Sequence, residues 1–322
     1  MKMRLGCFLA LLAFLCPLAS MAKAAEVNFI TDFGFNGRHS YFYVALDKGY
    51  YKQEGLDVHI FRGQGSVDAI KNVASGAAMI GFADAGSLVL ARGNDKVPVK
   101  MIAVVYTVPA QAIFVLADSG IKSPKDLEGK TLADTASSSL RLLFPAYAEA
   151  TGIDASKVHW VTADSSALSS ILALKRADGI GQFIVGQALI EKATAPEGVR
   201  ALALKDVGLN FYGNGIIAGE DTISKNPGML KAFVRATIKG MKDAFADPAE
   251  AARIMNKYQK QIDPAVIEQE TKMVKDLATV KGMPLGKIDP VRAKETVDII
   301  SKYFKMRHPV APKDVFVAGF VE

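Results

Sequence analysis

The sequence contains only two cysteines, Cys7 and Cys16, and both lie among its first 24 residues. Residues 25–322 therefore cannot form a disulfide-stapled scaffold, a cysteine-based metal site or a cysteine nucleophile. The four histidines form no HExxH-type pair, and the serine-rich segments lack a G-x-S-x-G elbow. The residues thus indicate no catalytic group, metal or cofactor, and we expect a protein that is not an enzyme.

A strong net charge is also missing. The chain has 39 basic and 33 acidic residues, and three of the basic ones lie in the first 24 residues. This near balance lacks the basic surplus that is typical of nucleic-acid-binding proteins. We therefore expect no nucleic-acid partner.

The beginning of the chain has the pattern of a secretory signal peptide. Lys2 and Arg4 precede the apolar run "LGCFLALLAFLCPLAS", and small residues follow up to Ala24. A charged start, a short apolar middle and a small-residue cleavage site are the three parts of such a peptide. We predict a signal peptide over 1–24, cleaved after Ala24, and a location in the periplasm; an uncleaved anchor is the alternative.

Strand and helix patterns alternate through the first two thirds of the chain. Val27–Thr31 reads as a strand, and the apolar spacing of Phe42, Ala45 and Leu46 predicts a helix. This alternation indicates an α/β protein with mostly parallel sheets covered by helices. From Asp221 onward the pattern is helical, and four segments begin with Asn-Pro or Asp-Pro, in which the first residue can cap a helix.

Several blocks in order resemble one known family: "NGRHSYFYVALDKGYYKQEGLDVHI", "GSVDAIKNVASGAAMIGFADAGSL", "SGIKSPKDLEGKTLA" and "NPGMLKAFVRATIKGMKDAFADPAEA". They are similar to periplasmic solute-binding proteins of ABC importers. The branch that this chain resembles comprises NMT1/THI5-type binders of thiamine pyrimidine precursors and binders of sulfonate, taurine and nitrate.

The resemblance implies a type II periplasmic-binding-protein fold, with two α/β lobes joined by two hinge crossovers and extra C-terminal helices. Lobe one would comprise 25–109 and 213–322, and lobe two 110–212. The segments "YTVPAQA" and "FYGNGII" would form the hinge.

The resemblance also implies a function. Such a protein is a monomeric receptor that captures a solute between its lobes and docks on the permease and ATPase subunits of an importer. A heteroaromatic like the thiamine pyrimidine precursor is favoured here, with a sulfonate, taurine, nitrate or aromatic acid as alternatives. Fungal members of the family are pyrimidine-precursor synthases, but their cysteine-rich motif is absent. A binding module that serves a sensor is a third hypothesis.

Ligands of open α/β sheets lie beyond the carboxyl ends of strands, and this rule selects loops in both predicted lobes. In "DFGFNGRH", Phe33 could stack on a flat ring while Asn36 and His39 bond its edge. In "RGQGS", Gln64 and Ser66 lie where glycines allow a ligand to approach the backbone. The alternatives are core packing, a helix cap and a plain tight turn.

Two further loops follow from the same rule. Asp84 either accepts bonds from an amino group of the ligand or caps the next helix. Ser138 and Ser139 begin a helix, and Arg141 could bind a carboxylate or sulfonate if it faces the cleft. Tyr212 lies near the second crossover, and Tyr106, Gln111, Gln182, Gln187 and Asn214 are weaker candidates with packing or surface roles as the alternative.

Overall fold

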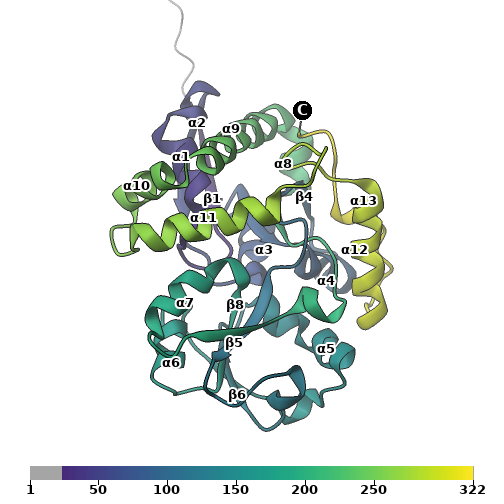
Figure 1. Cartoon of the computed structure of the whole chain (residues 1–322). Coiled ribbons are helices and arrows are strands. Elements are labelled where there is room, and N and C mark those ends of the chain that lie inside the picture. Colours follow the sequence, from purple (N-terminus) through teal and green to yellow (C-terminus); the bar gives the residue numbers. More distant parts are fainter. Residues whose placement is uncertain (1–23, 322) are drawn as a thin grey trace, which may run out of the picture.

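The computed structural model describes residues 24–321, so the predicted signal peptide lies outside the described residues except for Ala24. Two lobes, each built on a five-stranded sheet, lie one above the other (Figure 1). Among residues 24–321, none of the helices has the length and apolar character that crossing a membrane requires.

The sheet of lobe one has the order β2-β1-β3-β10-β4. β1 pairs in parallel with β2 and β3, whereas β10 returns antiparallel between β3 and β4. β3 is buried along its whole length, as its apolar sequence predicts. The strands are β1 (Ala25–Ile30), β2 (Leu56–Phe61), β3 (Ile80–Asp84), β4 (Val99–Val104) and β10 (Asn214–Gly219).

The sheet of lobe two has the order β7-β6-β8-β5-β9. β6 pairs in parallel with β7 and β8, and β5 runs antiparallel to β8 and β9. Both sheets are thus mixed, with two parallel and two antiparallel pairings each, and the prediction of mostly parallel sheets was wrong. The strands are β5 (Gln111–Leu116), β6 (Thr131–Asp134), β7 (His159–Thr162), β8 (Gly179–Phe183) and β9 (Val199–Ala203).

The chain passes between the sheets twice, after β4 and after β9. The predicted lobe boundaries, 109/110 and 212/213, fall within these two connections, and the position of the hinge itself stays a prediction. Two crossovers side by side allow a pair of lobes to move as rigid bodies.

Helices cover the faces of both sheets. In lobe one they follow the first three strands, and in lobe two they follow β6, β7 and β8. The helices are α1 (Ser40–Asp47), α2 (Tyr50–Gln53), α3 (Ser66–Ala74), α4 (Ala85–Asp95), α5 (Ser139–Thr151), α6 (Leu168–Ala173) and α7 (Gln187–Ala193); two short 3-10 turns are η1 (Gly37–His39) and η4 (Ile184–Gly186).

The C-terminal third is helical, as predicted. The side chains of Asp247, Asp263 and Asp289 accept bonds from the first turns of three of its helices, each with proline at the first position. Asn226 precedes a fourth helix without a side-chain cap bond. The helices are α8 (Glu220–Lys225), α9 (Pro227–Ala246), α10 (Pro248–Tyr258), α11 (Pro264–Ala278), α12 (Pro290–Tyr303) and α13 (Pro312–Val315).

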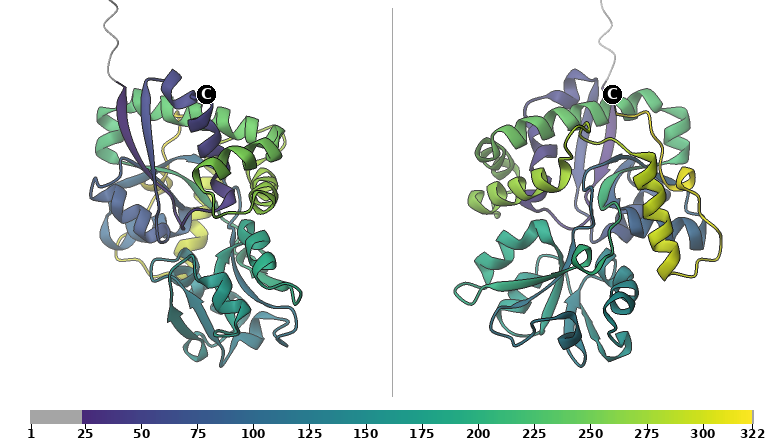
Figure 2. Two further views of the ribbon diagram at one scale, coloured as in Figure 1. Left: turned by 90° about the vertical axis from the view of Figure 1, so that its left-hand side faces the viewer. Right: turned by 45° about the vertical axis from the view of Figure 1, so that its right-hand side comes forward.

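These helices attach mainly to lobe one. α9 and α10 pack against α1, and α12 packs against α4 along one side of the lobe (Figure 2). α11 lies above α7 and contacts it, so the C-terminal helices also touch lobe two (Figure 1).

At Gly240, α9 lies so close to α1 that a larger residue would not fit without a shift. A side-chain carbon at Gly240 would lie 2.5 Å from the carbonyl oxygen of Tyr41 and 2.8 Å from the side chain of Ala45. Gly228, in the first turn of the same helix, has open space around the corresponding position. The two glycines therefore lie on the same helix, but only Gly240 is closely packed.

We expect Gly240→Ala to lower the free energy of unfolding by about 1–3 kcal/mol, because overpacking outweighs the better helix propensity of alanine. The control Gly228→Ala should be neutral or stabilising by up to about 1 kcal/mol. Denaturant unfolding measures both, and equal effects would contradict this account of the α1–α9 contact.

Candidate functional site

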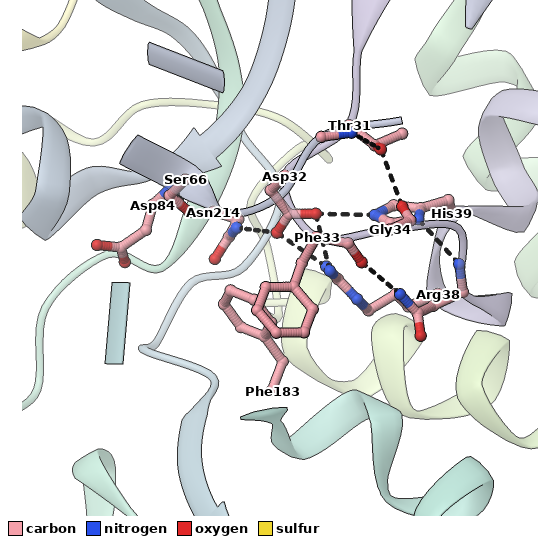
Figure 3. Close-up of polar contacts among 12 residues, drawn as sticks. Thr31, Asp32, Phe33, Gly34, Arg38, His39, Ser66, Asp84, Phe183 and Asn214 are labelled. Atoms are coloured by element: carbon pink, nitrogen blue, oxygen red, sulfur yellow. Dashed lines mark hydrogen bonds and ion pairs between the residues drawn. The ribbon is translucent and has the colours of Figure 1, made fainter. Parts of the chain in front are cut away.

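A buried carboxylate organises the loop that follows β1. Asp32 Oδ1 accepts bonds from Arg38 Nη2 at 2.8 Å and His39 Nε2 at 2.9 Å (Figure 3). Its Oδ2 accepts from Arg38 Nη1 at 3.0 Å and Asn214 Nδ2 at 2.6 Å. All four residues are fully buried. Asp32 thus joins the first loop of lobe one to the start of β10, beside the second crossover.

This cluster contains one cation and one anion. Burial raises the pKa of Asp32, but Arg38 and His39 together lower it by more, so the net pKa lies below its ordinary value. Burial and the nearby Arg38 lower the pKa of His39 to about 4. His39 is therefore neutral: its Nε2–H donates to Asp32 and its Nδ1 accepts from the backbone N–H of Asn36 at 3.3 Å.

Aromatic rings from the two lobes meet at this cluster. The ring of Phe33 meets that of Phe183, at the end of β8, edge to face with centroids 5.8 Å apart. The Arg38 guanidinium lies 4.5 Å from the centroid of the same Phe183 ring. Lobe two therefore contacts the Asp32 cluster directly (Figure 3).

A second set of contacts joins the lobes at the carboxyl ends of β3 and β6. Gln111 Nε2 donates to Asp84 Oδ2 at 2.7 Å and to Ser139 Oγ at 3.0 Å. The backbone N–H of Val67 donates to Ser137 O at 3.2 Å, and a side-chain carbon at Gly65 would lie only 2.0 Å from that oxygen. The lobes therefore touch through their backbones, which is a closed arrangement.

Buried carboxyls near these contacts are weakly acidic. Burial raises the pKa of Asp84 to about 6 and that of Asp134, at the end of β6, to about 7. Burial also raises the pKa of Glu270, on α11, to about 7, while its Oε2 accepts from the backbone N–H of Arg38 at 3.0 Å.

Two buried amide oxygens remain free to accept a hydrogen bond. Gln111 Oε1 and Asn214 Oδ1 have no partner within residues 24–321, although the NH₂ groups of both side chains are bonded. Buried polar atoms are almost always paired in folded proteins. These two oxygens suit a donor group of a solute or of water.

A cavity of about 370 Å³ lies between the lobes next to the Asp32 cluster. The first loop and the end of β2 form one wall, and the loop after β7 and α7 form the other. This size suits a small organic solute. The lining residues are Gly34, Phe35, Asn36, Arg62, Ser165, Ser166, Leu189, Gln261 and Ile262.

The first loop brings its three predicted residues together. Asn36 lines the cavity and donates from Nδ2 to Phe33 O at 2.6 Å. Phe33 and His39 lie behind it in the buried cluster. Gln64 is half-buried and pairs with Phe33 through an isolated β-bridge. Their contact with a solute stays a prediction.

The other predicted residues divide into two groups. Asp84 caps α4, as one alternative expected, by accepting from the backbone N–H of Ser87 at 2.7 Å, and its backbone N–H donates to Ser66 Oγ at 3.1 Å. Ser138 caps α5 by accepting from the backbone N–H of Leu140 at 3.1 Å. These serines and Asp84, like Ser139, lie at the lobe contact.

Arg141 and Tyr212 belong to the second group, because the structure does not bring them to the cluster. Arg141 Nη1 donates to Thr162 Oγ1 at 2.8 Å and its guanidinium lies 5.6 Å from the ring centroid of Trp160, both on β7. The Tyr212 hydroxyl accepts from the backbone N–H of Asp289 at 3.0 Å, toward α12.

Sequence reasoning missed Asp32, Arg38, Phe183 and Glu270. Asp32 had a usable signal, because it lies just beyond the carboxyl end of β1, the position that the strand-end rule selects. Glu270 lies 232 residues from the backbone N–H that it accepts from, and nothing local marks it. Among residues 24–321 no group of three or more His, Cys, Asp and Glu side chains could hold a metal ion.

Comparison with known structures confirms the type II periplasmic-binding-protein fold. The alkanesulfonate-binding protein SsuA from Xanthomonas axonopodis pv. citri superposes with a TM-score of 0.72 over 92% of this chain and 100% of that chain, at 14% identity. At this identity the likeness concerns the fold alone.

The sequence identifies the family. Residues 36–251 match the NMT1/THI5-like family, and the chain belongs to it. The formylaminopyrimidine-binding protein of Halalkalibacterium halodurans is 27% identical over 92% of each chain. A 4-amino-5-hydroxymethyl-2-methylpyrimidine phosphate synthase of Schizosaccharomyces pombe is 22% identical over 70% of this chain and 67% of its own.

The raised pKa of Asp134 leads to a prediction of how the stability of the protein depends on pH. A carboxyl whose pKa rises on folding from 3.8 to about 7 stabilises the fold below pH 4 and loses this contribution as the pH rises to 7. Asp134→Asn stays neutral throughout. Between pH 4 and pH 7, we expect the free energy of unfolding of the wild type to fall by on the order of 3 kcal/mol relative to that of this variant. Urea unfolding at several pH values measures the difference, and parallel curves would contradict it.

Proposed function

We propose that this chain is an extracytoplasmic solute-binding receptor of an ABC importer, and that its solute is an uncharged heteroaromatic of the thiamine-pyrimidine-precursor kind. The two lobes close on the solute, and the closed form docks, as a monomer, on the permease of the importer, whose ATPase drives transport. This proposal includes export to the periplasm by the predicted signal peptide over 1–24.

One observation carries the choice of solute: both arginines near the cavity are already neutralised. Arg38 forms a buried two-bond pair with Asp32, and Arg62 Nη2 donates to Asp164 Oδ1 at 2.6 Å. An anionic solute would have to compete with these carboxylates. Separating the buried Arg38–Asp32 pair is costly, whereas the exposed Arg62–Asp164 pair is weak. A neutral ring with amino groups would leave both pairs intact.

The polar groups of the site agree with such a ring. The amide of Asn36 lines the cavity together with Phe35, and the oxygens of Gln111 and Asn214, which are buried outside the cavity lining, have no donor among residues 24–321. The formylaminopyrimidine-binding relative, similar over 92% of both chains, supports the same class. Arg141, the residue on which the sulfonate alternative rests, is bonded to Thr162 and supports that alternative less.

The synthase alternative rests on the fungal relatives. Resemblance to such synthases would imply a cysteine-rich motif, and this chain has no cysteine after Cys16. We therefore favour binding without conversion. Steady consumption of a pyrimidine by the purified protein would contradict that choice.

A thermal-shift panel tests the proposed solute class. The panel holds formylaminopyrimidine and other thiamine precursors, riboflavin, taurine, alkanesulfonates, nitrate and aromatic acids. A ligand at 100 times its dissociation constant adds about 2.7 kcal/mol to stability, so a heteroaromatic compound should raise the melting temperature clearly. Stabilisation by sulfonates or nitrate alone would overturn the assignment.

Two substitutions test the location of the site with the best heteroaromatic compound. Asn36→Ala should weaken its binding roughly tenfold, because a hydrogen bond at the cavity wall is lost. The matched control Arg141→Ala should stay within about twofold, because that side chain is bonded within lobe two. Calorimetric titration measures both. Loss of affinity in Arg141→Ala with none in Asn36→Ala would place the site elsewhere.

A further inference from the structure

Two ion pairs cross between the lobes on either side of the cavity. On one side, Arg62 Nη2, after β2, donates to Asp164 Oδ1 at 2.6 Å and to Ser165 Oγ at 3.1 Å, both in the loop after β7. On the other, Lys192 on α7 pairs with Asp263, the residue before α11. Arg62 and Ser165 line the cavity near the first pair, and Gln261 and Ile262 line it near the second.

Both carboxylates are held in place by their own loops. Asp164 Oδ1 also accepts from the backbone N–H of Ser166 at 2.8 Å and from its hydroxyl at 2.6 Å. Asp263 Oδ1 accepts from the backbone N–H of Ala265 at 2.7 Å, which leaves Oδ2 for Lys192. A carboxylate fixed in this way loses less side-chain entropy when a cation from the other lobe arrives.

The two pairs have opposite polarity across the contact between the lobes. Lobe one supplies the cation of the first pair, Arg62, and its covering helix α11 supplies the anion of the second, Asp263. All four side chains are more than a third exposed, so each pair is weak and can separate in water. Because each pair spans the two lobes, a hinge opening must break both.

We propose that Arg62–Asp164 and Lys192–Asp263 form a two-point latch across the cavity, which favours the closed arrangement and slows the release of solute. Its consequence for release rests on the proposed function. The latch itself concerns only the balance between open and closed lobes, and it can be measured without any solute.

The distance between spin labels on the two lobes measures this balance. Glu149 on α5 and Lys231 on α9 are exposed, and cysteines placed there, with Cys7 and Cys16 replaced by serine, carry the labels. Asp164→Asn and Lys192→Gln each remove one charge, and asparagine can still accept the Ser166 bonds. Lys225→Gln, which breaks the Lys225–Asp221 pair within α8, is the matched control.

We expect each latch variant to raise the ratio of open to closed protein roughly 1.5- to 5-fold, and the double variant to multiply the two effects. In the wild type, 1 M NaCl should also raise the ratio of open to closed protein, because salt screens exposed pairs. In the double variant, the same salt should change this ratio little. Lys225→Gln should match the wild type. A wild type that is already open in low salt, or a double variant with the wild-type distance distribution, overturns the latch.

Release is measured separately with formylaminopyrimidine as the probe. Its dissociation rate should rise in the latch variants by the same factors as the ratio of open to closed protein. If this compound does not bind, the proposed solute is wrong, whereas the distance measurement still tests the latch independently. Unchanged dissociation from variants whose lobes do open would show that the pairs do not control release.

Discussion

The structure depends on the buried carboxylate of Asp32. It accepts four hydrogen bonds from three side chains, one of which, Asn214, starts the strand that returns from lobe two. A buried anion without such partners costs several kcal/mol, and removing one partner from a buried pair is strongly destabilising. The bonds therefore hold the first loop and the second crossover in one geometry, and both the cavity and the lobe contact are built on that geometry.

The C-terminal helices complete this arrangement from outside the two sheets. α11 supplies Glu270, which accepts from the backbone of η1, and Asp263, which meets Lys192 of lobe two. The same helix packs against α7. The extra helices therefore do more than cover lobe one, because they fix the first loop and take part in the contact between the lobes.

Much of this architecture could be predicted from local patterns. Strand and helix periods indicated the α/β alternation, and the Asp-Pro starts of α10, α11 and α12 proved to be capped helices. The rule on the carboxyl ends of strands selected Asp84, Ser66 and Ser139, which do lie at the lobe contact. These predictions needed only neighbours in the sequence.

The residues that lie away from the Asp32 cluster, or that sequence reasoning missed, depend on side-chain direction and on contacts between distant parts of the chain. Ser139 and Arg141 are two residues apart on one helix, so their side chains cannot point the same way, and Arg141 turns to β7. Tyr212 packs toward α12 and Glu270 accepts from the first loop, both across long stretches of sequence. A rule that selects a loop cannot decide which face of its helix meets the cleft.

The fold and the choice of solute likewise depend on different features of the chain. A sulfonate-binding protein shares this fold at 14% identity, so the fold alone does not determine the charge of a solute. In this chain the buried Arg38 is already paired with Asp32 within lobe one, and Arg62 pairs with Asp164 when the lobes are closed. An anion between the closed lobes would not find Arg38 free to pair with it, whereas a neutral ring brings no charge to bury. The pairing of these arginines, more than the architecture, is therefore the property that favours a neutral solute.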